Sequence, residues 1–189
     1  ETDKKRSQQI LKTVMPTSVA NELQSSGKVR SRRYDDVAIF ICDLVGFTSF
    51  CEKNNPELVV ETLQGIIESF ENTFEDFGLE KIKTVGDAIV AVAGLSSHAT
   101  SPIKSCVDCA YKIREVANSA TIPWDLHIGI HSGSLVAGTI GTKTVQFDIL
   151  GKNVNIAFNI CDKSDANQIL ISSDAWMTAR NEIKVKSIG

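Results

Sequence analysis

The segment Ile39–Thr48, with the sequence IFICDLVGFT, constrains the fold of this chain most strongly. It opens with an unbroken apolar run, which predicts a strand that is buried on both faces of a sheet. The strand ends at Asp43, and a glycine turn then leads to a predicted helix start at Thr48. A carboxylate at the exit of a buried strand lies at the rim of a packed sheet, where binding and catalytic groups are commonly placed.

A second carboxylate, Asp87, lies in the segment IKTVGDAIVAV. Gly86 and Asp87 separate two short runs rich in β-branched residues, which is typical of a β-hairpin. If the hairpin and the first strand belong to one sheet, Asp43 and Asp87 come together. Two carboxylate ligands favour Mg²⁺ or Mn²⁺ over zinc.

The composition favours a single folded domain. The chain has 189 residues, of which 42% are hydrophobic, and this suits one sizeable core. The net charge of −3 argues against a nucleic-acid surface, because binding to phosphate backbones needs a basic patch. No apolar run approaches the roughly 18 residues of a membrane span. The five scattered cysteines are typical of reduced thiols, so we expect a cytoplasmic domain.

Residues 1–33 are predicted to form a helical linker or docking segment ahead of a domain at residues 34–189. The apolar stripe in ILKTVMPTSVANEL is interrupted by Pro16, which predicts two short helices, and the basic loop KVRSRR follows them. Because the chain begins with Glu1 rather than Met, we expect it to be part of a longer protein. That protein would carry an upstream regulatory domain, whether or not it is tethered to a membrane.

The remaining pattern predicts an α+β fold of the ferredoxin-like type. The order is βαββαβ with an appended strand and helix, which gives an antiparallel-rich sheet with helices on one face. The predicted elements are a strand at 36–43, a helix at 56–77, a hairpin at 80–93, a helix at 102–119, strands at 124–131 and 135–140, a further strand or strand end at 145–150, a helix at 151–162 and a strand at 168–172.

Two histidines, His127 and His131, lie four residues apart in the segment HIGIH. On a strand this spacing puts both side chains on one face. No nucleophile or third metal ligand accompanies them, so we assign them neither a catalytic nor a metal-binding role.

Four blocks of the sequence resemble the catalytic domain of the class III adenylyl and guanylyl cyclases. In chain order they are ICDLVGFTSF, KTVGDAIVAVAGL, HIGIHSGSLVAGTIG and QFDILGKNVNIA. The resemblance covers about residues 34–173. It implies that the 3′-hydroxyl of a nucleoside triphosphate attacks its own α-phosphate, giving a cyclic nucleotide and pyrophosphate. It also implies a homodimer with active sites shared between the subunits.

The resemblance assigns two Mg²⁺ or Mn²⁺ ions per site to Asp43 and Asp87, with the backbone carbonyl of Leu44 as a further ligand. One ion would make the attacking hydroxyl more acidic, and the other would neutralise charge on the triphosphate. The β- and γ-phosphates would be bound by backbone N–H groups at a turn that enters a helix. The residues of this turn are Val45, Gly46, Phe47 and Thr48.

Lys83 and Asp148, with Ile149 beside them, match the substrate-reading positions of the family's adenylyl cyclases. Adenine offers an acceptor at N1 and a donor amine at N6, so a lysine and a carboxylate complement it. Guanine has the reverse polarity on that edge, and guanylyl cyclases of the family typically have Glu and a small polar residue there. The expected substrate is therefore ATP. In the dimer, Lys83 would serve the site opposite to the one that Asp87 serves.

Asn155 matches the asparagine that orients the ribose and assists catalysis in the family. One helical turn later the family has an arginine that stabilises charge on the pentavalent phosphate, and here that position is Asn159. Loss of a transition-state donor can lower a rate on the order of 10²-fold. Either the protein turns over slowly, or another cation takes this role, or the residue was altered to trap substrate.

The resemblance also implies a C-terminal hairpin with a lysine that holds the triphosphate. We expect this hairpin to lie beyond Gly189, so neither Lys184 nor Lys186 is assigned that task. The leading hypothesis is an ATP-using cyclase. One alternative is a degenerate cyclase-homology domain that binds nucleotide or a partner and regulates without catalysis. Another is a different phosphoryl-transfer enzyme on the same core, such as a palm-type polymerase or a dinucleotide cyclase.

Overall fold

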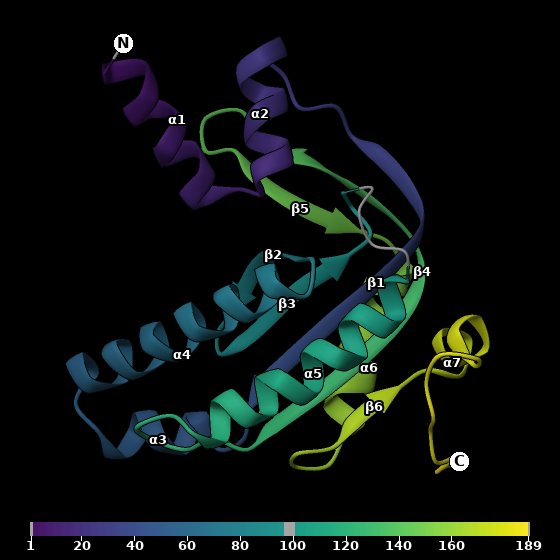
Figure 1. Ribbon diagram of the computed structural model, residues 1–189. Coiled ribbons are helices and arrows are strands. Elements are labelled where there is room, and N and C mark those ends of the chain that lie inside the picture. Colours follow the sequence, from purple (N-terminus) through teal and green to yellow (C-terminus); the bar gives the residue numbers. More distant parts are fainter. Residues whose placement is uncertain (1, 97–100, 189) are drawn as a thin grey trace.

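The computed structural model describes residues 2–96 and 101–188, and its centre is one curved sheet with helices on both faces (Figure 1). The elements in chain order are α1 Thr2–Val14, α2 Thr17–Ser26, β1 Arg32–Leu44, α3 Phe47–Lys53, α4 Pro56–Asp76, β2 Leu79–Val85, β3 Ala88–Ala93, α5 Pro102–Asn118, β4 Leu126–Ile140, β5 Gln146–Leu150, α6 Lys152–Lys163, β6 Ile169–Ile171 and α7 Ser173–Ala179.

The strand order is β2-β3-β1-β4-β5, and β6 pairs with β4 outside this path. All the pairings are antiparallel except that of β4 with β6. The predicted α+β class and ferredoxin-like order are therefore confirmed. Figure 1 shows β1 and β4 as two long, curved strands that run through the middle of the sheet.

The long strand β4 differs from the prediction of two separate strands. The polar stretch around Gly133 reads as a turn in the sequence, yet Gly133 lies in the ladder opposite Val37 of β1. The strand continues because β1 supplies a paired neighbour along almost its whole length, with a register shift between Tyr34 and Val37. A single strand, β4, thus runs the full length of the sheet along the strand direction.

The two faces of β1 pack against different groups of helices. Ala38, Phe40 and Cys42 belong to the cluster that includes α4 and α5. The alternate residues Ile39 and Ile41 belong to a second cluster, which includes residues of α6 and α2. Burial on both faces explains the unbroken apolar run, as predicted.

The expectation of helices on one face holds for α4 and α5 but not for α6. The apolar stripe of α6, formed by Val154, Ala157 and Cys161, packs in the second cluster on the opposite face. Val19 of α2 is buried in the same cluster. The sequence shows that a helix has an apolar stripe, but not which face of the sheet the stripe covers. The short helix α7 was not predicted.

The two N-terminal helices are separated at Pro16, as predicted. α2 contacts the sheet through Ser18, whose hydroxyl donates to Glu80 at 3.2 Å, and through a 3.0 Å ion pair between Glu22 and Arg32. The division into a linker at 1–33 and a domain at 34–189 remains a prediction. Among the described helices, none combines the length and the apolar character needed to cross a bilayer.

Candidate active site

Asp43 and Asp87 are brought together by the register of β1 and β3. Cys42 lies opposite Ile89, so the next residue of β1, Asp43, lies beside the turn that carries Asp87. On its other side Asp43 lies opposite His127 of β4. The convergence expected from the sequence is therefore present in the structure, and it is set by the backbone pairing of central strands.

This carboxylate pair has an unfavourable electrostatic environment. Burial, followed by a hydrogen bond and charge repulsion from Asp87, raises the pKa of Asp43 from its ordinary value of 3.8 to about 7. The N–H of Leu44, which donates to Oδ1 of Asp43 at 3.0 Å, opposes the shift only in part. A divalent cation would remove the repulsion, because both groups then face a positive charge.

The ligands available for such an ion are oxygen atoms. Within residues 2–96 and 101–188 there is no cluster of three or more His, Cys, Asp or Glu side chains suited to a metal. The side chain of Leu44 is a hydrocarbon without a donor atom, so only its backbone could contribute. A site with two carboxylates suits Mg²⁺ or Mn²⁺, which commonly complete their coordination with water and substrate phosphate. The donor set at Asp43 and Asp87 therefore fits the predicted metal.

The turn from Val45 to Thr48 differs in two respects from the prediction. The N–H of Val45 donates to the carbonyl of Asp125 at 2.9 Å, so this amide is already paired and does not face a phosphate. Gly46, with φ of 77°, precedes α3, which begins at Phe47 rather than Thr48. The Phe47 side chain is buried against Trp124, with ring centroids 5.8 Å apart. The predicted amides of Gly46, Phe47 and Thr48 lie at the start of α3.

Lys83 and Asp148 form an ion pair between the two outer strands of the main path. Nζ of Lys83 is 2.8 Å from Oδ2 of Asp148, and their side chains are 36% and 22% exposed. β2 and β5 stand at opposite ends of the strand order, yet they contact each other because the sheet curls. Figure 1 shows β5 above the β2–β3 hairpin in the view. The pair predicted to read the base is thus assembled within one chain.

A β-bulge in β2 directs Lys83 towards this face. Lys81 lies opposite Ala91, whereas Lys83 lies opposite Val90, and the register shifts between them. Lys81 consequently points to the other face, where it pairs with Glu71 of α4. Simple alternation would put both lysines on one face, so the bulge is the feature that sequence reasoning missed.

Ile149 contributes mainly to the packing around Asp148. Its side chain is 2% exposed and belongs to the cluster that contains α6. Its N–H donates to Oδ1 of Asp148 at 2.8 Å, which fixes that carboxylate beside Lys83. The side chain of Ile149 is therefore part of the core and is not exposed to a substrate.

Asn155 and Asn159 lie one turn apart on the exposed side of α6. Lys152 precedes Asn155 by three residues and is also exposed, so the three side chains follow one stripe. The buried side of the same helix includes a polar residue, Asn153, which sequence reasoning overlooked. Its place in an otherwise apolar stripe was the available signal.

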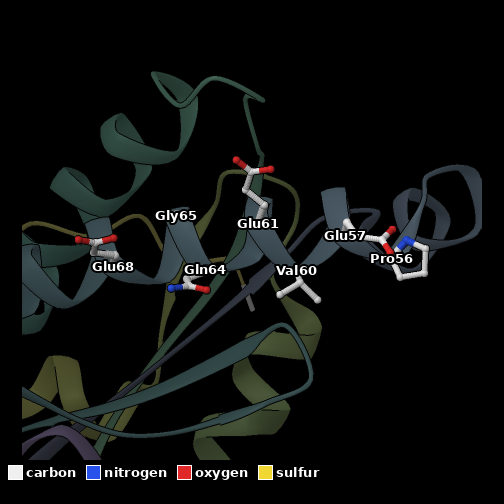
Figure 2. Close-up of a pocket in the computed structure, with 7 residues that line it drawn as sticks. All are labelled: Pro56, Glu57, Val60, Glu61, Gln64, Gly65 and Glu68. Carbon is white, nitrogen blue, oxygen red and sulfur yellow. The ribbon is translucent and has the colours of Figure 1, made fainter.

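A shallow depression on α4 contains none of the predicted site residues. Figure 2 shows Val60 and Gln64 on one side of the helix and Glu61 on another. Three glutamates would repel a triphosphate, so this surface does not suit the nucleotide. The lining residues are Pro56, Glu57, Val60, Glu61, Gln64, Gly65 and Glu68.

Residues 29–189 match the family model described as the adenylate and guanylate cyclase catalytic domain. The chain belongs to this family. Among the curated relatives of this cyclase domain, human guanylate cyclase soluble subunit alpha-2 is 29% identical over 186 residues. The match covers 96% of this chain and 25% of the human protein, so the chain spans about a quarter of that relative's length.

Solved cyclase structures of both kinds share the fold. The guanylate cyclase domain of RhGC from Catenaria anguillulae, in complex with GTP, has a TM-score of 0.77 and 23% identity over 80% of this chain and 85% of that one. The adenylyl cyclase CyaB from P. aeruginosa has a TM-score of 0.73 and 22% identity, covering 82% and 85%. Because both kinds share one fold, the choice of base depends on side chains.

Proposed function

We propose that this cyclase domain uses ATP and forms 3′,5′-cyclic AMP and pyrophosphate. The observation that carries the proposal is the ion pair of Lys83 and Asp148, 2.8 Å apart. Together they present a donor and an acceptor, the complement of N1 and the N6 amine of adenine. A guanine edge would face like groups on both sides, a mismatch that polar sites reject strongly.

Mg²⁺ or Mn²⁺ would be held by Asp43 and Asp87, with backbone and substrate oxygens completing the coordination. When bound, the ions would supply a more acidic 3′-hydroxyl and charge neutralisation at the triphosphate. The protein's own part is positioning. The amides of Gly46, Phe47 and Thr48 would face the phosphates, and Asn155 would orient the ribose.

We further propose that the domain acts as a homodimer in which each site combines the carboxylates of one subunit with the base-reading pair of the other. The match to a family of cyclases supports this arrangement. Full-length relatives are several times longer than this chain, which supports a regulatory domain elsewhere in the protein. We place the domain on the cytoplasmic side of the cell.

Asn159 favours a second candidate function, that of a regulatory cyclase-homology domain. An exposed asparagine supplies no positive charge for a pentavalent phosphate, and it occupies the arginine position of the family. Against this candidate stand both metal carboxylates and the base-reading pair, all of which are present. Slow catalysis would agree both with Asn159 and with the presence of the carboxylates and the base-reading pair.

The deciding experiment incubates the purified domain with ATP or with GTP in the presence of Mn²⁺. We expect cyclic AMP from ATP, and much less cyclic GMP from GTP. Asp43→Ala is the control, because it removes a metal carboxylate. Product from ATP that does not exceed the Asp43→Ala background would support the regulatory function, and cyclic GMP as the main product would overturn the base assignment.

A further inference from the structure

Two histidines of β4 hold opposite ends of α6. Nδ1 of His127 is 2.6 Å from the carbonyl oxygen of Ser164, the residue that follows α6. Because a carbonyl oxygen can only accept, this nitrogen carries the proton. At the other end, Nε2 of His131 is 3.1 Å from Oδ1 of Asn153, the second residue of α6. The segment HIGIH therefore spans the helix from end to end.

The direction of the His131 hydrogen bond follows from its neighbours. Nδ2 of Asn153 donates to the carbonyl of Ser134 at 2.7 Å, so Oδ1 is the acceptor and Nε2 of His131 is the donor. Nδ1 of His131 then accepts from the hydroxyl of Ser172 at 2.7 Å. His131 is 1% exposed and Asn153 is 8% exposed, and the atoms named here are all paired. Such satisfied buried networks rigidify a core.

Glycines on either side of His131 let α6 lie directly on β4. A Cβ atom at Gly129 would come within 2.4 Å of the backbone nitrogen of Cys161, and one at Gly133 within 2.4 Å of Nδ2 of Asn153. Gly129, His131 and Gly133 alternate along the strand and so share one face. Between these two glycines, His131 is therefore the side chain that lies between helix and strand.

The opposite side of α6 carries the predicted site residues. Asn155 and Asn159 each lie two residues beyond a member of the docked stripe, Asn153 or Ala157, which is about 200° around the helix. The first turn lacks a side-chain cap, because Gly151 stands at the N-cap. The contacts of Asn153 with His131 and Ser134 instead attach this first turn to the sheet.

We propose that His131 and Asn153 are positioning residues for the cyclisation reaction. The hydrogen bond between them fixes the rotation and height of α6 on β4, and with them the places of Asn155 and Asn159. His131 itself touches no substrate. The inference rests on the proposed function, because Asn155 and Asn159 matter only if the site acts on a nucleotide. A displacement of about 1 Å can lower a rate on the order of 10²-fold.

Two conservative variants distinguish the contributions of the two ring nitrogens of His131. In His131→Gln the side-chain amide can reach the position of Nε2 and donate to Asn153. In His131→Asn the shorter amide reaches the position of Nδ1 and leaves Oδ1 of Asn153 without its donor, while Nδ2 of Asn153 keeps its bond to Ser134. We expect kcat with ATP to fall about tenfold or more in His131→Asn, and to be largely retained in His131→Gln.

Phe70→Leu is the control for a loss of stability alone. Phe70 is fully buried on the face of the sheet opposite α6. We expect the midpoint of thermal unfolding of the Phe70→Leu variant to fall. Its kcat, measured well below that midpoint, should stay unchanged. If kcat follows the midpoint equally in all three variants, or if His131→Asn keeps full kcat, the positioning role is overturned.

Hydrogen exchange of the amides of residues 152–160 gives a readout that does not need activity. Exchange should be faster in His131→Asn than in His131→Gln, because only the first variant removes the hydrogen bond to Oδ1 of Asn153. Equal exchange in the two variants would overturn the positioning role. If the unmodified domain makes no cyclic nucleotide, the proposed function fails while this measurement still tests the docking of α6.

Discussion

The two polar pairs of the candidate site differ in how their charges are balanced. Asp43 and Asp87 carry like charges, and burial and repulsion raise the pKa of Asp43 to about 7. Lys83 and Asp148 carry opposite charges and already pair at 2.8 Å. The first pair therefore needs a cation, whereas the second is complete before any ligand arrives. Ion binding should therefore stabilise the protein at the first pair, whereas recognition at the second pair should need little rearrangement.

The largest effect is expected when the first pair loses one charge. Asp43→Asn should lower cyclic AMP formation by about a thousandfold, because the ions lose a charged ligand. The same variant should raise the midpoint of thermal unfolding of the metal-free protein at pH 8 by about a few degrees, since the repulsion disappears. Asp76→Asn, an exposed residue at the end of α4, is the activity control. Activity retained in Asp43→Asn would contradict the need of the first pair for a cation.

The second pair is tested by reversing one of its charges. Lys83→Glu should lower kcat/KM for ATP about 10²-fold or more, and adding Asp148→Ser should move the preference towards GTP. Lys81→Glu is a closely matched control, because it lies on the same strand and breaks the ion pair with Glu71 on the opposite face. The ratio of ATP to GTP use should not change in the control. An equal change in both lysine variants would show that charge alone matters.

A smaller effect is expected at α6, which carries neither pair. Asn159→Arg should raise kcat about tenfold with little change in KM, if the missing positive charge acts only in the transition state. Asn159→Gln, which adds length without charge, is the control. A change in KM with constant kcat would instead place residue 159 in ground-state binding.

The smallest effect concerns pH. Because the pKa of Asp43 is raised, the metal-free folded protein becomes less stable as the pH rises from about 4 through about 7. Below about pH 7 an ion must displace a proton, so its apparent affinity falls about tenfold per pH unit. Mn²⁺ should therefore raise the midpoint of thermal unfolding more at pH 8 than at pH 6. In Asp43→Asn this difference between the two pH values should be absent. An equal shift at both pH values would contradict the raised pKa of Asp43.

The first pair could be predicted from the sequence because its geometry is local. An apolar run, a hairpin turn and the pairing of two central strands suffice to bring Asp43 beside Asp87. The second pair depends on features without a clear sequence signal. The bulge that turns Lys83 away from Lys81 and the curl that brings β5 to β2 both arise from tertiary packing. Strict alternation alone would have put Lys83 on the same face as Lys81, whereas the family resemblance paired Lys83 with Asp148.

Other differences have similar causes. The N–H of Val45 is taken by Asp125, a residue that is distant in the chain. The side of the sheet covered by α6 depends on Gly129 and Gly133, which make room for a helix only once the strand is in place. The short helix α7 begins at a Ser172 cap, a signal that is common in loops as well.

The curl of the sheet also bears on how the protein behaves at high concentration. Open sheet edges can recruit edges of other molecules and so start aggregation. Here β2 and β5 turn towards each other, β2 is interrupted by its bulge, and β6 is only three residues long. None of these borders offers a long, flat row of free backbone groups, so the fold itself discourages unwanted strand-to-strand growth.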